Sequence, residues 1–257
     1  MRVAAIQHDI VWEDRDATLA HVGPQVARAA ATGARLVILT EMFATGFSMR
    51  THLTAEAIDG PTVTWMHEQA QRHDVWLAGS LALAPPAGST EERPTNSLLL
   101  VGADGTVHRY AKIHPFSYGG EHERFRGGQD SVVVDVEGVR LGLSVCYDLR
   151  FADLYWDRAA EVDAELLVAN WPAPRRHHWR TLLDARAVEN QCYVVAANRV
   201  GRGGNELDYA GDSRIVDPGG EVLAAGAGAE TILTAEIDPQ VVAETRERFP
   251  FALDRRR

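Results

Sequence analysis

The sequence predicts one α/β domain over residues 1–257, built around a mixed system of β-sheets. Apolar runs of strand length alternate with segments that carry apolar residues at helical spacing along most of the chain. In the middle of the chain, two pairs of β-rich runs are joined by short turns, which indicates antiparallel hairpins. The loop-rich stretch at residues 85–89 is too short to separate two domains, and the sequence contains no repeat or charge block.

The expected strands are short apolar or β-branched runs, which are typical of strands in a buried sheet. They lie at residues 3–7, 36–39, 75–83, 97–101, 106–110, 132–136, 139–145, 166–169, 193–197, 214–216, 221–224 and 231–237. The turns at 103–105 and 137–138 contain glycine and join two of these pairs into hairpins.

The expected helices carry apolar residues three and four positions apart. They lie at residues 17–31, 60–73, 151–160 and 179–190. Gly23 and Pro24 interrupt the first of these, so we expect a kink there or a later start. Pro61 suits the first turn of the second helix, because a proline at that position lacks only an N–H that has no helical partner.

Composition and charge exclude several classes of protein. Apolar residues make up 46% of the chain and charged residues 24%, as in ordinary soluble proteins. The 36 acidic and 26 basic residues give a net charge of −10, which argues against nucleic acid or an anionic membrane as the main partner. The first residues turn polar too early for a signal peptide, and no apolar run approaches the roughly 20 residues that span a bilayer. We therefore expect a cytoplasmic protein.

Metal and phosphate sites have no signal in the sequence. The two cysteines, Cys146 and Cys192, are too few for a disulfide framework or a cysteine-rich zinc site. The histidines lack the spacing of a His-Glu-x-x-His motif, and no phosphate-binding loop is present. We therefore expect no metal site.

Cys146 is the first candidate for a reactive side chain. It follows the apolar run at 141–145 and precedes the helix-like stretch at 151–160. A nucleophile at a strand-to-helix turn lies beside free backbone N–H groups, which can stabilise an oxyanion. Free cysteines are also among the most buried residues, so core packing is the alternative. For Cys192, between a helix pattern and a strand, core packing is the better interpretation.

Two further charged residues follow strand-like runs. Glu41 comes after the run at 36–39, where α/β folds place active-site groups, and burial would suit it to proton transfer. Lys112 follows the run at 106–110. Taken alone, each is equally an ordinary charge at a strand end or on the surface. Glu121 and Glu123 lie in a segment that resembles a solvated loop as much as a site.

Taken together, these residues resemble a known catalytic pattern. Glu41, Lys112 and Cys146 stand in that order in the segments LTEMF (39–43), YAKIH (110–114) and SVCYDLRF (144–151). This pattern resembles the Glu-Lys-Cys triad of the nitrilase (carbon–nitrogen hydrolase) superfamily, over nearly the whole chain. The segments NWPAPR (170–175), ARAVENQ (185–191), NRVG (198–201) and YAGDS (209–213) resemble its bacterial ω-amidase branch.

The resemblance implies a fold, an assembly and a mechanism. The fold is a four-layer α-β-β-α sandwich, in which two sheets face each other between outer helices. The assembly is a homodimer, and the reaction uses no metal or organic cofactor. In the implied mechanism Glu41 takes the thiol proton of Cys146, while Lys112 and the backbone N–H of Tyr147 hold the oxyanion.

Two further pairs of charged residues are placed beside the triad. Glu121 matches the second glutamate of many members of the superfamily and would orient Lys112 or the substrate nitrogen, with Glu123 as the alternative. Asp148 and Arg150 are expected to pair with each other and fix the turn at the cysteine rather than touch substrate.

The ω-amidase branch implies a small substrate with a terminal amide and a 2-oxo acid end, such as 2-oxoglutaramate or 2-oxosuccinamate. Its carboxylate needs a cation, and Arg175 and Arg176 follow the loop that contains Trp171. The residues expected to bind substrate are Arg175, Arg176, Phe43 and Trp171. Each arginine is equally a solvent-facing residue of a basic loop. The apolar residues that would either line the pocket or belong to the core are Phe43, Phe47 and Met49.

Three alternatives stay open. The same triad suits other carbon–nitrogen hydrolase substrates, namely nitriles, N-carbamoyl amines, deaminated glutathione and acyl chains on proteins. A non-catalytic binding protein could keep the fold, although all three triad positions are present. A redox-sensing thiol protein could use Cys146, although Cys192 has no evident role as a resolving partner.

Overall fold

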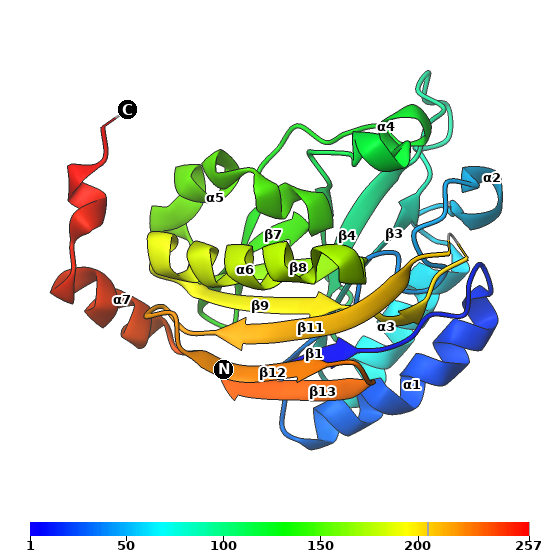
Figure 1. Cartoon of the computed structure of the whole chain (residues 1–257). Helices are drawn as coiled ribbons and strands as arrows, with labels where there is room; N and C mark the ends of the chain where they lie inside the picture. Colours follow the sequence, from blue (N-terminus) through cyan, green and yellow to red (C-terminus); the bar gives the residue numbers. More distant parts are fainter. Residues whose placement is uncertain (205, 257) are drawn as a thin grey trace.

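Two mixed β-sheets face each other, and helices cover the outer face of each (Figure 1). The computed structural model describes residues 1–204 and 206–256. Separate apolar clusters fill the space between the sheets and the two spaces between sheet and helices. The four-layer α-β-β-α sandwich expected from the sequence is therefore confirmed.

The first sheet contains the first strands of the chain and closes with the last one. In spatial order its strands are β13 (Thr231–Glu236), β1 (Arg2–Gln7), β2 (Leu36–Ile38), β3 (Trp76–Leu83), β4 (Thr95–Val101) and β5 (Val107–Ala111). Strands β1, β2 and β3 are parallel, whereas β4, β5 and β13 pair antiparallel. The hairpin expected between β4 and β5 is present.

The second sheet has the same plan, with three parallel strands, β7, β8 and β9, at its centre. In spatial order its strands are β10 (Val200–Arg202), β11 (Asp208–Val216), β9 (Tyr193–Asn198), β8 (Ala164–Ala169), β7 (Val139–Val145) and β6 (Val133–Val136), with β12 (Val222–Ala227) also paired to β11. The second expected hairpin, between β6 and β7, is also present.

Long helices form the outer layers, and short ones lie in loops. The α-helices are α1 (Arg15–Ala31), α2 (Thr51–Thr54), α3 (Pro61–His73), α4 (Glu121–Arg124), α5 (Ala152–Arg158), α6 (Arg176–Asn190) and α7 (Pro239–Arg248). Short 3₁₀ helices lie at Ser117–Gly119, Cys146–Arg150, Ala159–Glu161, Ala173–Arg175 and Phe251–Asp254. No helix among the described residues is both long and apolar enough to cross a bilayer.

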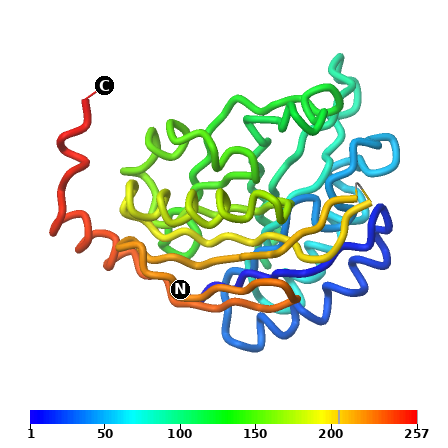
Figure 2. Tube along the Cα trace, viewed as in Figure 1, coloured from blue at the N-terminus to red at the C-terminus, as the bar shows by residue number. Residues whose placement is uncertain are grey.

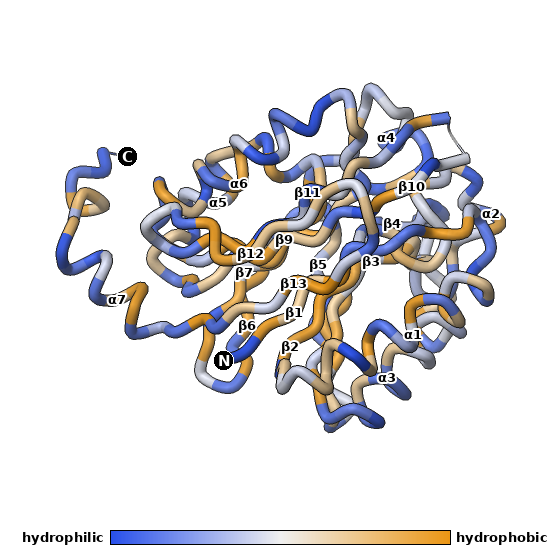
Figure 3. Tube along the Cα trace, turned by 60° about the horizontal axis from the view of Figure 1, so that its bottom comes forward, coloured by the Kyte–Doolittle hydropathy of each residue, from blue (hydrophilic) through white to orange (hydrophobic). Residues whose placement is uncertain are grey.

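Side-chain alternation along β1 shows how the layers form. Val3 and Ala5 belong to the cluster between the sheets, whereas Ala4 and Ile6 belong to the cluster under α1 and α3. Successive side chains of a strand point to opposite faces, so one strand serves two cores. Accordingly the most apolar segments in Figure 3 lie along the central strands, and the polar residues lie on the outer helices and loops.

The helices that differ from the sequence expectation include α1 and α7. The first begins at Arg15, earlier than expected, and continues through Pro24. The Asp14 side chain accepts a hydrogen bond of 3.0 Å from Ala17 N, which caps this earlier start. Helix α7 was not predicted, because only its Val242 is buried and no apolar stripe marks it.

Both sheets bring strand ends to one edge of the sandwich. The chain leaves β2 toward Glu41, β7 toward Cys146 and β8 toward Asn170. The backbone N–H of Asn170 donates to Glu41 Oε2 at 2.8 Å, so the edge of one sheet contacts the edge of the other. This edge is where parallel sheets place ligands.

Candidate active site

A cavity of about 630 Å³ opens at this edge, and Glu41 and Cys146 both line it. Its other walls come from segments far apart in the sequence, among them the loop after β1, the stretch before α2 and the hairpin of β10 and β11. A cavity of this size suits a small organic ligand.

Glu41 is fully buried and held by hydrogen bonds on both carboxylate oxygens. Oε1 accepts from Lys112 Nζ at 2.9 Å and from Asn96 Nδ2 at 2.8 Å. Oε2 accepts from the backbone N–H of Asn170, and Asn170 Nδ2 donates to the Glu41 carbonyl at 2.9 Å. These contacts leave the carboxylate one orientation, which faces the cavity.

Lys112 lies between two carboxylates. Its Nζ donates to Glu121 Oε2 at 2.8 Å as well as to Glu41, and all three side chains are buried. Glu121 also accepts from Asn96 Nδ2 at 3.0 Å and from the backbone N–H of Phe116 at 2.6 Å. Glu123 is exposed, so of the two glutamates considered, the structure brings Glu121 to the lysine.

Cys146 occupies a strained turn. It is the first residue after β7, and its φ of 48° lies in the left-handed region that side-chain-bearing residues rarely adopt. A 3₁₀ helix, Cys146–Arg150, begins there. The first backbone N–H groups of a helix lack partners within it, and Tyr147 is its second residue. The expected strand-to-helix turn at the cysteine is present.

Asp148 holds this turn in place through its hydrogen bonds. Its Oδ2 accepts from Val145 N at 3.0 Å and from the Tyr110 hydroxyl at 2.7 Å. Its Oδ1 accepts from the backbone N–H and from Nδ1 of His114 at 3.0 and 2.8 Å. Because β5 carries Tyr110 and leads into Lys112, one buried carboxylate connects the cysteine turn to the lysine segment.

The charges of the site shift its pKa values in a consistent way. Burial alone would lower the pKa of Lys112, but the carboxylates of Glu121 and Glu41 outweigh it and raise that pKa well above its usual range. Burial raises the pKa of Glu121, against the effect of the lysine. Burial, with repulsion from Glu41, also raises the pKa of the Cys146 thiol well above its usual range. The raised pKa favours the protonated thiol of Cys146 over the thiolate.

Two of the four residues proposed to bind substrate line the cavity, and two do not. Trp171 and Arg175 line it, and the Arg175 guanidinium lies 5.5 Å from the centre of the Phe116 ring. Arg176 lies outside the cavity and forms a bidentate pair with Asp212 at 2.8 Å. Arg175 ends the 3₁₀ helix Ala173–Arg175 and Arg176 begins α6, where the pair with Asp212 holds its side chain outside the cavity.

Phe43 is the second residue that the expectation misplaced. It is fully buried in the cluster between the first sheet and its helices, on the face of the sheet away from the cavity. Its ring packs on Trp65 and fills the space beside Gly79, where an added Cβ would come within 2.7 Å of the ring. Phe47 and Met49, by contrast, line the cavity.

Sequence reasoning missed three residues of the site. Asn96 and Asn170 bind the Glu41 carboxylate and backbone, and only Asn170, which follows a buried strand as Glu41 does, carried a signal. Arg150 was expected to pair with Asp148 but instead lines the cavity, with its guanidinium 4.7 Å from the centre of the Trp171 ring. Asp148 is already saturated by other donors, which leaves Arg150 free to face the cavity.

Comparison with known proteins agrees with this geometry. A family model described as carbon-nitrogen hydrolase matches residues 2–247. The chain belongs to the carbon–nitrogen hydrolase family. It is therefore an enzyme that hydrolyses carbon–nitrogen bonds. Among the described residues of this hydrolase, no group of three or more histidine, cysteine or acidic side chains could hold a metal ion.

Individual relatives of this carbon–nitrogen hydrolase align over most of its length. It is 42% identical to omega-amidase YafV of Escherichia coli over 97% of this chain and 94% of that protein. It is 34% identical to 2-oxoglutaramate amidase of Bacillus subtilis over 84% of this chain and 83% of that protein. The crystal structure of XC1258 from Xanthomonas campestris, a CN-hydrolase superfamily protein with an arsenic adduct in the active site, superposes with a TM-score of 0.93. It is 38% identical and covers 100% of this chain and 97% of that one.

Proposed function

We propose that this protein is an ω-amidase. It hydrolyses the terminal amide of a small 2-oxo acid, of the 2-oxoglutaramate or 2-oxosuccinamate type, to ammonia and the dicarboxylate. The observation that carries the proposal is the pairing of two features in one cavity. The cavity holds Cys146 beside Glu41, and it is also lined by Arg150 and Arg175.

The two arginines supply the cationic end that a 2-oxo acid needs. Within residues 1–204 and 206–256, neither Arg150 nor Arg175 forms an ion pair, whereas Arg50, which also lines the cavity, is paired with Glu13. Arg150 contacts His178 Nδ1 at 3.2 Å and the Trp171 ring, and both contacts leave donors of its guanidinium available. A planar guanidinium binds a carboxylate through two parallel hydrogen bonds, which fixes both position and orientation.

The first half of the reaction forms a thioester. As the thiol of Cys146 passes its proton to Glu41, Sγ forms a bond to the amide carbon and the carbonyl oxygen takes the negative charge. Lys112 and the backbone N–H of Tyr147 donate to this oxygen, and each such donor contributes about 3 kcal/mol. Glu41 then gives the proton to the amide nitrogen, the carbon–nitrogen bond breaks, and ammonia leaves.

The second half returns the enzyme to its starting state. Glu41 takes a proton from water, the oxygen of that water attacks the thioester carbon, and the bond to Sγ breaks. The proton returns to sulfur, so no net proton is gained or lost by the site. Glu121, at 2.8 Å from Lys112 Nζ, gives the ammonium a second anchor besides Glu41. The raised pKa of the Cys146 thiol supports this sequence, because the thiolate forms only when Glu41 accepts the proton.

The test is turnover of 2-oxoglutaramate, followed by release of ammonia and of 2-oxoglutarate. We expect turnover in the wild type and none with Cys146→Ala. Arg150→Gln and Arg175→Gln should each raise KM about tenfold or more, since each removes a charged hydrogen bond worth roughly 1.5–3 kcal/mol. Arg176→Gln is the matched control and should leave KM unchanged, because its guanidinium is bound to Asp212 outside the cavity.

Other substrates give the result that would contradict the assignment. If the wild type releases no ammonia from 2-oxoglutaramate or 2-oxosuccinamate, the ω-amidase assignment is wrong. Turnover of deaminated glutathione, a nitrile or an N-carbamoyl amine in the same assay would then identify the substrate class and leave the roles of Glu41, Lys112 and Cys146 to be tested with it.

A further inference from the structure

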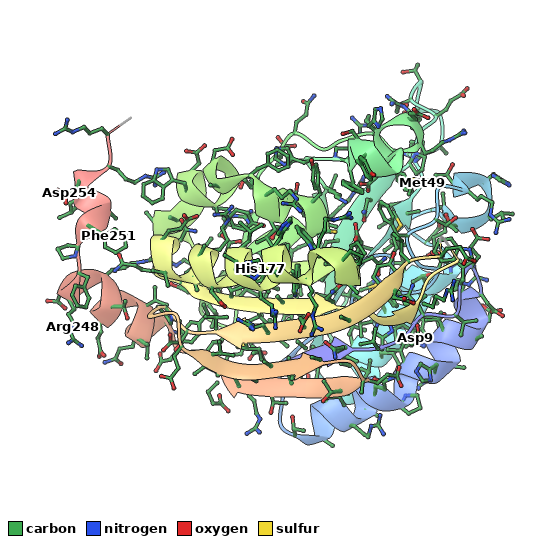
Figure 4. All side chains as sticks on the ribbon, in the orientation of Figure 1. Asp9, Met49, His177, Arg248, Phe251 and Asp254 are labelled. Atoms are coloured by element: carbon green, nitrogen blue, oxygen red, sulfur yellow. The ribbon has the colours of Figure 1, made fainter. Side chains whose placement is uncertain are left out.

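One wall of the cavity is built from two loops that are far apart in the sequence. Trp12 comes from the loop between β1 and α1, whereas Gly204 and Tyr209 come from the hairpin of β10 and β11. We call the side chains of Trp12 and Tyr209 the aromatic wall. Asp9, in the first of these loops, lies on the same side of the molecule as Met49, which also lines the cavity (Figure 4).

The aromatic wall is packed without slack. The Trp12 indole lies between two glycines: a Cβ on Gly204 would come within 2.3 Å of Nε1, and a Cβ on Gly46 within 2.9 Å of Cε3. The Asp9 carboxylate fills the space beside Gly201 in the same way, at 2.2 Å from an added Cβ. Glycine at these positions lets the two loops approach each other closely, so the wall moves if either loop moves.

A single buried arginine holds both loops. Arg199 follows β9 directly and has no exposed surface. Its Nη2 donates to Asp9 Oδ1 at 2.6 Å and to the carbonyls of Ile10 and Arg202 at 3.3 and 3.4 Å. Its guanidinium carbon lies 4.6 Å from the centre of the Tyr209 ring. One side chain therefore contacts the first loop, the second loop and the wall itself.

The burial of Arg199 is energetically unfavourable. Its one carboxylate partner, Asp9, is 49% exposed, and its Nη1 is buried without a hydrogen-bond partner in the described part of the chain. A buried cation with an unsatisfied donor is less favourable than a well-packed apolar side chain of similar size. The contacts of the guanidinium with both loops offer an explanation for an arginine at this buried position.

We propose that Arg199 is a positioning residue that fixes the aromatic wall and thereby restricts the cavity to short acyl groups. Without its guanidinium, the loop of Trp12 and the hairpin of Tyr209 lose their shared anchor, and the cavity widens. The inference rests on the proposed function only in taking Cys146 as the nucleophile at the cavity. It adds a residue that sets which acyl groups reach that nucleophile.

The test compares a small and a bulky thiol reagent at Cys146. Iodoacetamide needs little room at Cys146, whereas the ring of N-phenylmaleimide needs more of the space that the aromatic wall bounds. Rate constants are measured by mass spectrometry for the wild type, Arg199→Met and Arg199→Lys. We expect the ratio of bulky to small reactivity to rise at least tenfold in Arg199→Met and less in Arg199→Lys, because an ammonium keeps the charge but cannot span the same partners.

The matched control is Arg246→Met. Arg246 also donates to backbone carbonyls, those of Ala159, Val162 and Asn190, but it lies in α7 and does not line the cavity. Figure 4 shows Arg248 of the same helix at the opposite end of the molecule from Asp9 and Met49. The reactivity ratio should stay at the wild-type value in this variant. An unchanged ratio in Arg199→Met, or an equal rise in Arg246→Met, overturns the proposal.

Steady-state kinetics give a second readout. In Arg199→Met, KM for 2-oxoglutaramate should rise about tenfold while kcat falls by less than threefold, since the triad keeps its own contacts. A fall in kcat alone would contradict a role in the wall. If Arg199→Met does not fold, Asp9→Asn serves instead: it keeps the shape of the partner, removes its charge and should raise the reactivity ratio about threefold. No rise in that variant also overturns the proposal.

Failure of the proposed function is distinguishable from failure of this inference. The reactivity ratio needs no natural substrate, so it can be measured even if the wild type does not hydrolyse 2-oxoglutaramate. If neither reagent modifies Cys146 in the wild type, the proposed nucleophile itself is wrong. Cys192 is fully buried and serves as the internal reference in both cases.

Discussion

Two of the buried groups of acidic and basic side chains differ in their composition. In the first, Lys112 lies between the carboxylates of Glu41 and Glu121 beside the cavity. In the second, Arg158 binds Glu165 through Nε and Nη2, and neither lines the cavity. All five side chains are at most 4% exposed. The second group is a balanced pair of one acidic and one basic side chain, whereas the first has two acidic side chains and one basic side chain.

This difference separates a charge pair that serves the fold from one that serves chemistry. In the balanced pair Arg158 donates to Glu165 through Nε and Nη2, and its Nη1 donates to the Leu143 carbonyl at 3.0 Å. In the first group Glu41 also accepts hydrogen bonds from neutral donors, namely Asn96 and the backbone N–H of Asn170. In the proposed mechanism it is Glu41 that accepts the proton of Cys146.

The largest expected effect is on turnover. Cys146→Ala should reduce kcat by about 10⁴-fold or more, because no other group of the site can form the covalent intermediate. The melting temperature should fall little, since the contacts of Lys112 with Glu41 and Glu121 stay in place. Cys192→Ala is the control and should keep wild-type turnover, measured by ammonia release. Turnover within tenfold of wild type in Cys146→Ala would falsify the nucleophile assignment.

The balanced pair should respond in the opposite way. Glu165→Gln leaves the buried cation of Arg158 without its counter-charge, so the free energy of unfolding should fall by about 3–5 kcal/mol. Turnover per folded molecule at 25 °C should stay within twofold of wild type, because the pair does not contact the cavity. Urea unfolding and the ammonia assay measure the two quantities. A loss of turnover without a loss of stability would show that the pair of Arg158 and Glu165 does not mainly stabilise the fold.

A third kind of buried group, one with no ionic partner, sharpens the comparison. Burial lowers the pKa of His8 to about 4, although its hydrogen bond to the Asp9 carbonyl opposes this shift. The unfolded chain therefore binds a proton at His8 before the folded chain does as the pH falls from about 6.5 to 4. The stability contributed by the neutral imidazole is complete above pH 6.5, and about 3 kcal/mol of it is lost by pH 4.

Unfolding by urea at several pH values between 7 and 4 tests this. His8→Gln should remove most of the acid-induced loss, whereas His177→Gln, at an exposed position on α6, should leave it unchanged. An identical pH dependence in wild type and His8→Gln would show that other groups cause the loss.

The smallest expected effect concerns Glu121, the second acidic side chain beside Lys112. Glu121→Gln should lower kcat about 100-fold, because Lys112 loses one of its two anchors and the oxyanion donor moves. The free energy of unfolding should fall less than in Glu165→Gln, since Lys112 keeps Glu41 as its counter-charge. Glu123→Gln, on the exposed side of the same short helix, should change neither quantity. A loss of stability as large as that of Glu165→Gln would mean that Glu121 serves the fold.

The sequence could predict the site where a charged or reactive residue comes shortly after a strand. Glu41, Lys112 and Cys146 each do so, and the structure brings the three together. Which of two neighbouring side chains faces a cavity depends on helix phase and on competing partners, which spacing alone does not contain. For that reason Arg175 was placed well, and Arg176, held by Asp212, was not.

The remaining misses have the same physical cause. Arg150 was assigned to Asp148 because the two are close in sequence, but Tyr110 and His114 reach that carboxylate from another strand. Phe43 lies only a few residues after β2, but its side chain packs on the face of the sheet that the helices cover. The homodimer, the cytoplasmic location and the absence of a cofactor stay predictions.

The pairing of β1 with β13 has a consequence for how the chain folds. Arg2 lies opposite Glu236 and Gln7 opposite Thr231, and Figure 2 shows the first and last strands side by side. Because the ribosome makes the amino end first, the first sheet cannot be completed until β13, its last strand, has been made. The second sheet, whose strands all lie between residues 133 and 227, can assemble earlier. Such long loop closures slow folding, so we expect the first sheet to become protected from hydrogen exchange last during refolding.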